Sequence, residues 1–461
     1  MSDKRIDGLI AEAKTLRYSR RQVMRRAVAM GLSVPAVTTA LSTSGYAAPN
    51  QVRKFRQAPA QLEGTSLNVL GASYFVLAGQ ERFDAQLAEW GEQNGVDVAI
   101  DYIAWPDLQA RIAASIQAQD GPDIIQLWSP WPYLYQENLV DVNDIASELA
   151  DAEGGYFDWV TNTAAVEGNW HSIPYGTSSS AFNYRMSYFE EAGAETFPDT
   201  WEDLFAVGKT LKEMGKPLGQ ALGHSLGDPP SFTYPYMWAY GAMEVEDDGT
   251  TVAFNRPEFV EGMQTFIQGW QDAYDETGLA WDDSANNTAF LSDQLSATLN
   301  GSSIYIRASG PEDDGGVPEI AEDMNHADFP QGPAGRFTQL GAQSWGITSY
   351  SDNIDGAKDF LRHWYSQDQL TSWYEANEGY YIPASPMYTE LEVYTADPKL
   401  APFLNLVNYG RNMGYAGPAN EKAALSYSRY IVIDTFARAV QDGDAQGAID
   451  WGADQLERIY G

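Results

Sequence analysis

The chain has 461 residues, with 28 Lys and Arg against 64 Asp and Glu, so its formal net charge is −36 at pH 7. Such an acidic surface repels nucleic acid and anionic lipid, and we expect neither as a partner. The sequence contains no cysteine, which excludes disulfides, thiolate metal sites, cysteine nucleophiles and a lipidated cysteine anchor. Its four histidines do not pair at metal-ligand spacing, so we predict no metal and no cofactor.

The N-terminal region has the pattern of a secretory signal. A serine and two arginines at 19–21 precede an apolar run over 27–41, and small residues at 44–48 suit a signal peptidase. The arginine pair indicates twin-arginine export from a prokaryotic cytoplasm, with residues 1–48 as the signal peptide. The apolar run is too short to span a membrane, so we expect a periplasmic or extracellular protein. Residues 49–66 are predicted to form a flexible linker.

The first part of the mature chain alternates strands and helices. Short apolar strands are predicted at 67–70, 96–103 and 124–128. Between them, apolar residues at helical spacing predict helices around 83–90 and 108–116. This βαβ rhythm is typical of a parallel sheet with helices on both faces, and the length of the chain favours two domains.

Mostly helices are predicted in the remainder. Thr200 has the position of an N-cap before an acidic first turn, which predicts a helix to Lys212. Residues 311–319 are rich in acids and glycine and are expected to form a mobile surface loop. Further helices are predicted at 232–240, from Pro257, and at 355–366, 369–376 and 445–460.

Seven motifs recur in a characteristic order over residues 67–461. They are Gly121-Pro122-Asp123-Ile124-Ile125 with Trp128, and segments at 138–142, 173–185, 197–204, 289–302, 329–347 and 357–361. In this order they resemble the bacterial extracellular solute-binding proteins of family 1, which includes the maltose-binding proteins. One departure is Arg185, which stands where Asn or Lys is usual.

The resemblance implies an α/β fold of the periplasmic-binding-protein type II, with two α/β lobes, a hinge of crossing strands and a ligand cleft between the lobes. We expect the first lobe to combine 67–178 with 303–350, and the second to combine 179–302 with 351–461. The implied mechanism is hinge closure around a small solute, which a monomer then delivers to the permease subunits of an ABC transporter. No chemistry is performed on the ligand, so the resemblance does not imply an enzyme.

Aromatic and polar side chains near strand ends are the candidate ligand contacts, because open α/β sheets bind ligands beyond the carboxyl ends of their strands. Aromatic rings stack on the C–H faces of sugars, and polar groups bond the hydroxyls. The set favours a sugar or oligosaccharide over a polyamine, although aromatic residues are often ordinary core and an arginine could anchor a sugar acid. The candidates are Tyr74, Phe75, Trp128, Trp131, Ser178, Ser231, Phe232, Ser303, Tyr305, Arg307, Gln343, Trp345 and Tyr380.

Gly223-His224-Ser225-Leu226-Gly227 fits the G-x-S-x-G nucleophile elbow and is the main competing signal. An elbow needs a buried strand before the serine and a helix directly after it. The preceding segment, 217–222, is a weak strand, and Asp228-Pro229-Pro230 follows. A secreted serine hydrolase that uses Ser225 therefore stays as an alternative. A glycosidase would need a carboxylate pair, which an acidic chain offers everywhere, and a ligand sensor without transport would share the binding-protein fold.

Overall fold

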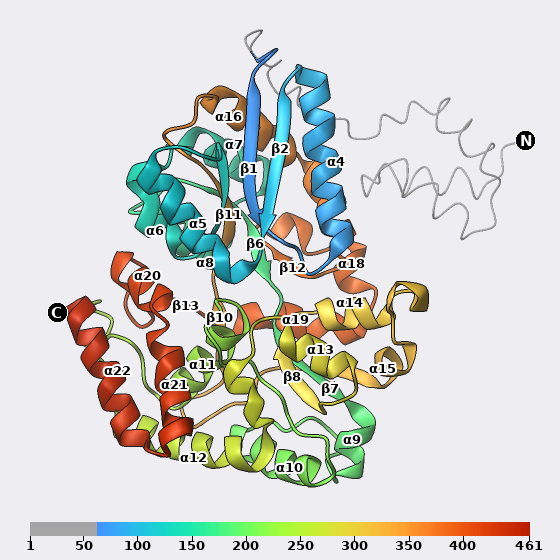
Figure 1. Ribbon diagram of the computed structural model, residues 1–461, viewed down its shortest axis with the longest axis vertical. Coiled ribbons are helices and arrows are strands. Elements are labelled where there is room, and N and C mark those ends of the chain that lie inside the picture. The colour runs from blue at the N-terminus through green and yellow to red at the C-terminus, as the bar shows by residue number, and fades with distance from the viewer. Residues whose placement is uncertain (1–61) are drawn as a thin grey trace, which may run out of the picture. The chain divides into compact units, whose positions relative to one another are not determined.

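A six-stranded sheet forms the first lobe of the computed structural model, which describes residues 62–461 (Figure 1). β1 runs parallel to its neighbours β2 and β3, whereas β11 lies antiparallel between β3 and β6. The predicted twin-arginine signal and most of the predicted linker lie outside the described residues. In spatial order the strands are β12 (Tyr381–Pro383), β6 (Ile173–Ser178), β11 (Gln343–Ile347), β3 (Ile124–Trp128), β1 (Ser66–Ala72) and β2 (Asp97–Ile103).

Amphipathic helices cover this sheet. The helix α4 (Leu77–Asn94) buries Phe83, Leu87 and Trp90 on one face and ends at Gly95, whose left-handed φ of 65° suits glycine. Two helices from much later in the chain, α16 (Ile354–Trp364) and α17 (Gln367–Ala376), pack against α4. The other elements of this lobe are α5 (Trp105–Ala118), α6 (Trp131–Tyr135), α7 (Asn143–Glu153), α8 (Asp158–Ala164) and the hairpin β4 (Ala165–Val166) with β5 (Asn169–Trp170).

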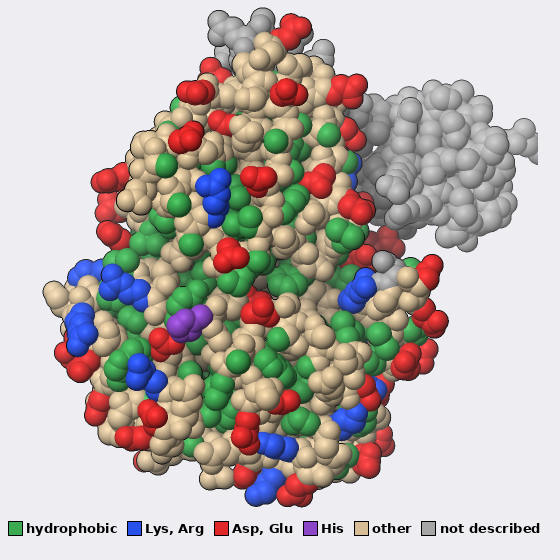
Figure 2. Space-filling view, viewed as in Figure 1, with side chains coloured by type: hydrophobic (Ala, Val, Ile, Leu, Met, Phe, Trp, Pro, Cys, Tyr) green, Lys and Arg blue, Asp and Glu red, His purple; other side chains and the backbone are tan. Residues whose placement is uncertain are grey.

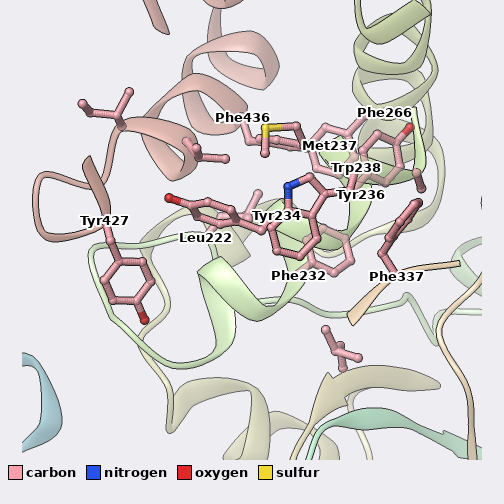
Figure 3. Packing of buried hydrophobic residues seen from close by; sticks show 14 of the residues in the cluster. Leu222, Phe232, Tyr234, Tyr236, Met237, Trp238, Phe266, Phe337, Tyr427 and Phe436 are labelled. Carbon is pink, nitrogen blue, oxygen red and sulfur yellow. The ribbon is translucent and has the colours of Figure 1, made fainter. Parts of the chain in front are cut away.

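A three-stranded antiparallel sheet, in the order β8-β7-β9, forms the second lobe. Its large core joins α10, α11, α12 and α21 through buried aromatic rings, several of which Figure 3 shows. The strands are β7 (Ala181–Arg185), β8 (Ala297–Asn300) and β9 (Met324–Ala327). The helices are α9 (Met186–Glu191), α10 (Trp201–Glu213), α11 (Asp228–Ala239), α12 (Pro257–Ala273), α13 (Ala285–Leu291), α14 (Ser303–Ser309), α15 (Pro318–Asp323), α19 (Ala401–Asn405), α20 (Glu421–Ser428), α21 (Ile431–Asp442) and α22 (Ala445–Tyr460). The short helix α18 (Glu392–Thr395) packs on the first lobe instead, where the Tyr394 hydroxyl donates to the Tyr381 carbonyl of β12.

Sequence patterns within each element predicted where most of these elements lie. Thr200 caps α10 and accepts a hydrogen bond from the Asp203 amide at 3.1 Å, as predicted. Predicted helices also occur at Pro257 and at 445–460. The expected surface loop at 311–319 is partly helical, because a 3₁₀ turn spans Glu312–Asp314 and α15 begins at Pro318.

Strand pairing divides the chain differently from the expected lobe boundaries. The chain crosses between the sheets from β6 to β7, close to the expected boundary after Ser178. However, β9 pairs with β7, so residues 324–327 belong to the second sheet rather than the first. In turn, β12 pairs with β6, so residues 381–383 belong to the first sheet rather than the second. Leu62 is 3% exposed, so residues 62–66 are part of the folded lobe rather than a linker.

Two short parallel strands, β10 (Thr338–Leu340) and β13 (Gly410–Asn412), complete the described part of the chain. Among residues 62–461 no helix combines the length and the apolar composition needed to cross a membrane.

Candidate ligand-binding cleft

Aromatic residues follow three parallel strands of the first lobe at the edge that meets the second lobe. Trp128 ends β3, and Trp105 follows β2; their rings meet edge to face at 5.6 Å. The Tyr427 hydroxyl of α20, in the second lobe, lies near the Trp128 indole. Phe75 follows β1, is 37% exposed and lies 6.2 Å from the ring of Tyr380. The strand ends therefore present an aromatic wall to the second lobe.

Asp228, the first residue of α11, faces this wall from the second lobe. One carboxylate oxygen, Oδ2, accepts hydrogen bonds from the side-chain amides of Asn286 and Asn300, both at 2.8 Å. Within residues 62–461 no hydrogen bond is made to the other oxygen, Oδ1. Burial raises the pKa of Asp228 well above its ordinary value, and the neighbouring Asp283 carboxylate adds to this rise. Asp228 thus offers one hydrogen-bonding oxygen whose orientation is fixed by two amides.

Asp283 fixes the position of Asp228 through a hydrogen bond to its backbone. It is 7% exposed and accepts hydrogen bonds from the Asp228 amide at 2.8 Å and from the Ser225 hydroxyl. Because the Asp228 amide is one of the free donors at the start of α11, Asp283 acts as a cap for that helix. Burial also raises the pKa of Asp283, and these hydrogen bonds partly offset the rise.

The same contacts decide against a nucleophile elbow at 223–227. Ser225 is completely buried, and its hydroxyl donates to a carboxylate rather than to a base. The neighbouring His224 points elsewhere, since its Nε2 lies 2.6 Å from Asp434 and its ring stacks on Tyr430 at 4.4 Å. The segment 217–222 before the serine forms no strand, only isolated bridges at Leu218, and α11 starts only at Asp228. The serine hydrolase alternative fails on this geometry.

Tyr380 closes the other end of the aromatic wall. Its carbonyl accepts a hydrogen bond from the Ser179 amide at 2.8 Å, at the point where the chain crosses between the lobes. Its ring lies directly over Gly301, where a Cβ atom would come within 2.7 Å of the ring. Ser178 lies beside the Tyr380 hydroxyl, and the carboxylate of Asp228 is near enough to act on it electrostatically.

Two further predicted residues contribute hydroxyl groups near these walls. Ser231, on α11, donates to the Gly227 carbonyl at 2.8 Å and to the Gln339 side chain at 3.3 Å. Ser303 is 4% exposed, and its hydroxyl has no partner among the described residues. Its neighbour Ser302 is tied to the crossing by a 3.0 Å hydrogen bond from its amide to the Ser179 hydroxyl.

Several candidate residues lie inside the first lobe rather than at the cleft. Trp345 is 1% exposed and stacks on Phe83 at 5.1 Å. Gln343 accepts a 2.6 Å hydrogen bond from Tyr175. Both belong to β11, which is buried along its whole length, so neither can face a ligand. Tyr74 packs edge to face on core aromatic rings, and Trp131 is completely buried.

The remaining candidates lie in or behind the second lobe. Phe232, labelled in Figure 3, is completely buried on α11. Its ring meets that of Trp201 at 5.5 Å. Tyr305 donates a 2.7 Å hydrogen bond to Asp397, away from the residues described above. Arg307 is exposed near Gly315, so it is not an anchor for a sugar acid at Asp228. These residues are therefore core or surface residues rather than ligand contacts.

Three residues that sequence reasoning did not select are Trp105, Asp228 and Tyr427. Trp105 follows β2 just as Trp128 ends β3, so the strand-end rule would have found it. Asp228 opens the helix that carries Ser231, and an acid at a helix N-terminus is a recognisable signal. Tyr427 comes from a distant segment, and nothing local connects it with Trp128.

A hollow of about 1180 Å³ lies beside the start of α20. It is lined by Tyr133 and Trp159 of the first lobe and by residues 410–422 of the second. The start of α20 faces this hollow, whereas Tyr427, near its end, faces Trp128. The short parallel strand β13 lines this hollow, but no strand of the six-stranded sheet ends there, so the strand-end argument favours the residues around Asp228 instead. Figure 2 shows hydrophobic side chains, with acidic ones among them, gathered across the middle of the visible face.

Comparison with known proteins agrees with a two-lobed binding protein. The family model of bacterial extracellular solute-binding proteins matches residues 85–402. This chain belongs to that family. Its members are binding proteins rather than enzymes, and they act outside the cytoplasm. A curated relative is the erythritol/L-threitol-binding protein of Mycolicibacterium smegmatis, 24% identical over 319 residues, which cover 63% of this chain and 64% of the relative.

Solved structures of other binding proteins share the fold. Maltose-bound MalE3 of T. maritima has a TM-score of 0.74 and 17% identity, with 86% of this chain and 100% of that chain covered. A solute-binding protein of an ABC transporter from Agrobacterium radiobacter K84, in complex with ribitol, has a TM-score of 0.70 and 17% identity, with 86% and 99% covered. The periplasmic-binding-protein-like fold expected from the motifs is confirmed.

Proposed function

We propose that this solute-binding protein captures a neutral sugar or polyol in the cleft at Asp228 and delivers it to an ABC transporter permease. The observation that carries the ligand class is Asp228, whose Oδ1 accepts no hydrogen bond within residues 62–461 and which lies near enough to Tyr380 to act on it electrostatically; the Tyr380 ring in turn lies 6.2 Å from that of Phe75. A carboxylate oxygen accepts hydrogen bonds from ligand hydroxyls, and aromatic rings pack on the C–H faces between those hydroxyls.

The electrostatics of the cleft favour a neutral ligand over a sugar acid. In the described part of the chain, no basic side chain forms an ion pair with Asp228 or Asp283, and none contributes to their raised pKa values. A carboxylate or phosphate on the ligand would therefore find no basic partner at these two acids. The ligands of the relatives, erythritol or L-threitol, maltose and ribitol, are all neutral polyhydroxy compounds, which supports the proposal.

Hinge closure and export complete the proposal. The closing lobes divide as the strand pairing does, with residues 62–178 and 343–383 in the first and 181–327 and 421–461 in the second. The twin-arginine signal at 1–48 exports the protein, which works as a monomer in the periplasm or outside the cell. Loaded protein then docks on the permease, whose partner subunits hydrolyse ATP in the cytoplasm.

The test is calorimetric titration of the purified protein and of its Asp228→Asn variant with ribitol, erythritol, glucose and maltose. An amide keeps the shape of the side chain but loses a charged acceptor, so affinity should fall by about 10- to 100-fold, or about 1.5–3 kcal/mol. Glu213→Gln, which neutralises an exposed acid at the end of α10, should bind like the wild type.

Each outcome bears on one part of the proposal. Equal affinity of Asp228→Asn and the wild type would remove Asp228 from the site. Failure of every neutral sugar and polyol to bind, in titration or as a thermal shift at millimolar ligand, would overturn the ligand class itself.

A further inference from the structure

The hollow of about 1180 Å³ beside the start of α20 is lined by both lobes. The first lobe contributes α6, α8 and β4 with the turn that follows it. The second lobe contributes β13, the segment after it and the first residues of α20. Its volume is slightly above the range of about 300–1,000 Å³ that is typical of small-molecule sites. A ligand in this hollow would therefore contact both sides of the hinge.

Arg411, the middle residue of β13, lines this hollow and has no acidic partner in the described part of the chain. Its guanidinium lies over two aromatic rings, 5.1 Å from the centre of Phe337 and 5.1 Å from that of Tyr415. Its Nη1 donates a 2.8 Å hydrogen bond to the Gly410 carbonyl, whereas Nε and Nη2 donate to no acceptor within residues 62–461. Acids are plentiful in a chain with 64 Asp and Glu, yet none pairs with this cation. The rings therefore hold in place a guanidinium that keeps donors for a ligand.

The other charged residues of the hollow differ in their exposure. Lys422, the second residue of α20, is half-buried like Arg411, and its Nζ donates a 2.8 Å hydrogen bond to the Tyr460 carbonyl. The three acids that line the hollow are all exposed, and they are Glu167, Asp247 and Glu421. Charges in full contact with water are screened, whereas partly buried charges act more strongly on a neighbouring group. The two half-buried bases therefore favour an anionic group on the ligand.

The remainder of the lining suits a sugar. Aromatic rings come from both lobes, with Tyr133 and Trp159 in the first and Tyr415 in the second. Such rings pack on the C–H faces of a sugar, and amides bond its hydroxyls. The amide side chains are those of Gln136, Asn162, Asn412 and Asn420. Within residues 62–461 the side chains of Asn162 and Asn412 make no hydrogen bond, so both can bond a ligand.

We propose that this hollow is a second binding site, which takes a sugar acid whose carboxylate pairs with Arg411. A planar guanidinium donates two parallel hydrogen bonds to a carboxylate, and such a pair is stronger than hydrogen bonds to a neutral hydroxyl. The site is separate from the one proposed for a neutral ligand, because neither Asp228 nor Tyr380 lines the hollow. The proposal therefore does not depend on the function proposed for Asp228.

The test is calorimetric titration of the purified protein with glucuronate and galacturonate. The wild type should bind at least one of them. Arg411→Gln should weaken that binding by at least about 10-fold, and Arg411→Lys, which keeps the charge but not the planar pair of donors, by at least about 3-fold. Arg458→Gln removes an exposed cation on α22, outside the hollow, and should bind like the wild type.

Asn162→Ala provides a second variant, on the first-lobe side of the hollow and at an exposed position where folding is not at risk. It should weaken binding of the sugar acid by at least about 3-fold, because the ligand contacts both lobes. Thermal unfolding without ligand shows whether each variant folds. If Arg411→Gln does not fold, Asn162→Ala decides, and wild-type affinity in it would overturn the proposal.

Asp228→Asn distinguishes the two sites. It should leave the affinity for the sugar acid unchanged, and Arg411→Gln should leave the affinity for a neutral sugar or polyol unchanged. Failure of both acids to bind at millimolar concentration, or equal binding by Arg411→Gln and the wild type, would overturn the second site and leave the proposed function standing. A sugar acid whose affinity falls in Asp228→Asn but not in Arg411→Gln would contradict both proposals.

Discussion

Glu244 shows what burial does to one carboxyl group in this acidic chain. It is 1% exposed, and its Oε1 accepts hydrogen bonds from Tyr234, at 3.2 Å, and from the Ser426 hydroxyl of α20. Its Oε2 has no partner among the described residues. Burial raises the pKa of Glu244 to about 7, against the lowering effect of the two hydroxyl groups. The fold therefore holds this group in its neutral form in mildly acidic solution.

The contribution of Glu244 to folding stability should consequently fall as the pH rises from about 4.5 to about 7. In this window the folded state keeps a proton that the unfolded state has lost, so the free energy of unfolding decreases with pH. Glu244→Gln stays neutral throughout. Its stability relative to the wild type should rise by about 1–3 kcal/mol between pH 4.5 and pH 8, measured by urea unfolding at both values.

Glu375→Gln, at an exposed position on α17, controls for the loss of one negative charge. It should show no such rise. If Glu244→Gln gained nothing over the wild type between the two pH values, the ionisation of Glu244 would not be coupled to folding as argued.

At the residue scale, the candidates that face the cleft lie at or beyond the end of a strand, whereas those within a strand are buried. Phe75 lies beyond the end of β1 and Trp128 is the last residue of β3, and both lie where the lobes meet. Trp345 lies within β11, which has neighbours on both edges and is covered on both faces, so its ring packs in the core. Sequence pattern cannot separate these cases, because it does not say where a strand stops within one or two residues.

At the scale of elements, local sequence patterns were sufficient to predict where helices lie. They were insufficient to predict to which lobe a strand belongs. The helix α22 occupies 445–460 as its spacing predicts, because its apolar face recurs within the element itself. The place of β9 and β12 depends instead on pairing with β7 and β6, far away in the sequence. Such pairing leaves no local trace, which explains why residues 324–327 and 381–383 were expected in the opposite lobes.

The cap of α10 gives a prediction at this scale. Thr200 accepts a hydrogen bond from the Asp203 amide, one of the free donors of the first turn. Thr200→Ala should lower the free energy of unfolding by about 1 kcal/mol, measured by urea denaturation, whereas Thr200→Ser should retain most of it. Ligand affinity should not change in either variant, because α10 lies at the far side of the second lobe from the cleft (Figure 1). A loss of affinity without a loss of stability would contradict this account.

At the scale of the whole molecule, repulsion among acidic groups opposes folding. The formal net charge is −36, and within residues 62–461 the ion pairs are few and mostly have at least one exposed partner. An example is Arg362 on α16, which pairs with Asp144 at 2.6 Å and Glu148 at 3.3 Å on α7. Exposed pairs of this kind contribute little, typically about 0–1 kcal/mol. The unpaired carboxylates should therefore dominate the response to salt.

We accordingly expect the thermal unfolding midpoint at pH 7 to rise as NaCl increases from 10 mM to 500 mM. Added salt shortens the screening length from about 30 Å to below about 8 Å, which weakens repulsion between distant acids more than attraction within close pairs. At pH 4, where many carboxylates are protonated, the same salt series should produce a smaller rise. Differential scanning calorimetry at both pH values measures the effect, and sucrose at matched osmolarity controls for solute exclusion. A midpoint that falls with salt at pH 7 would show that attraction within the ion pairs exceeds repulsion among the carboxylates. The excess of acids would then not destabilise this fold.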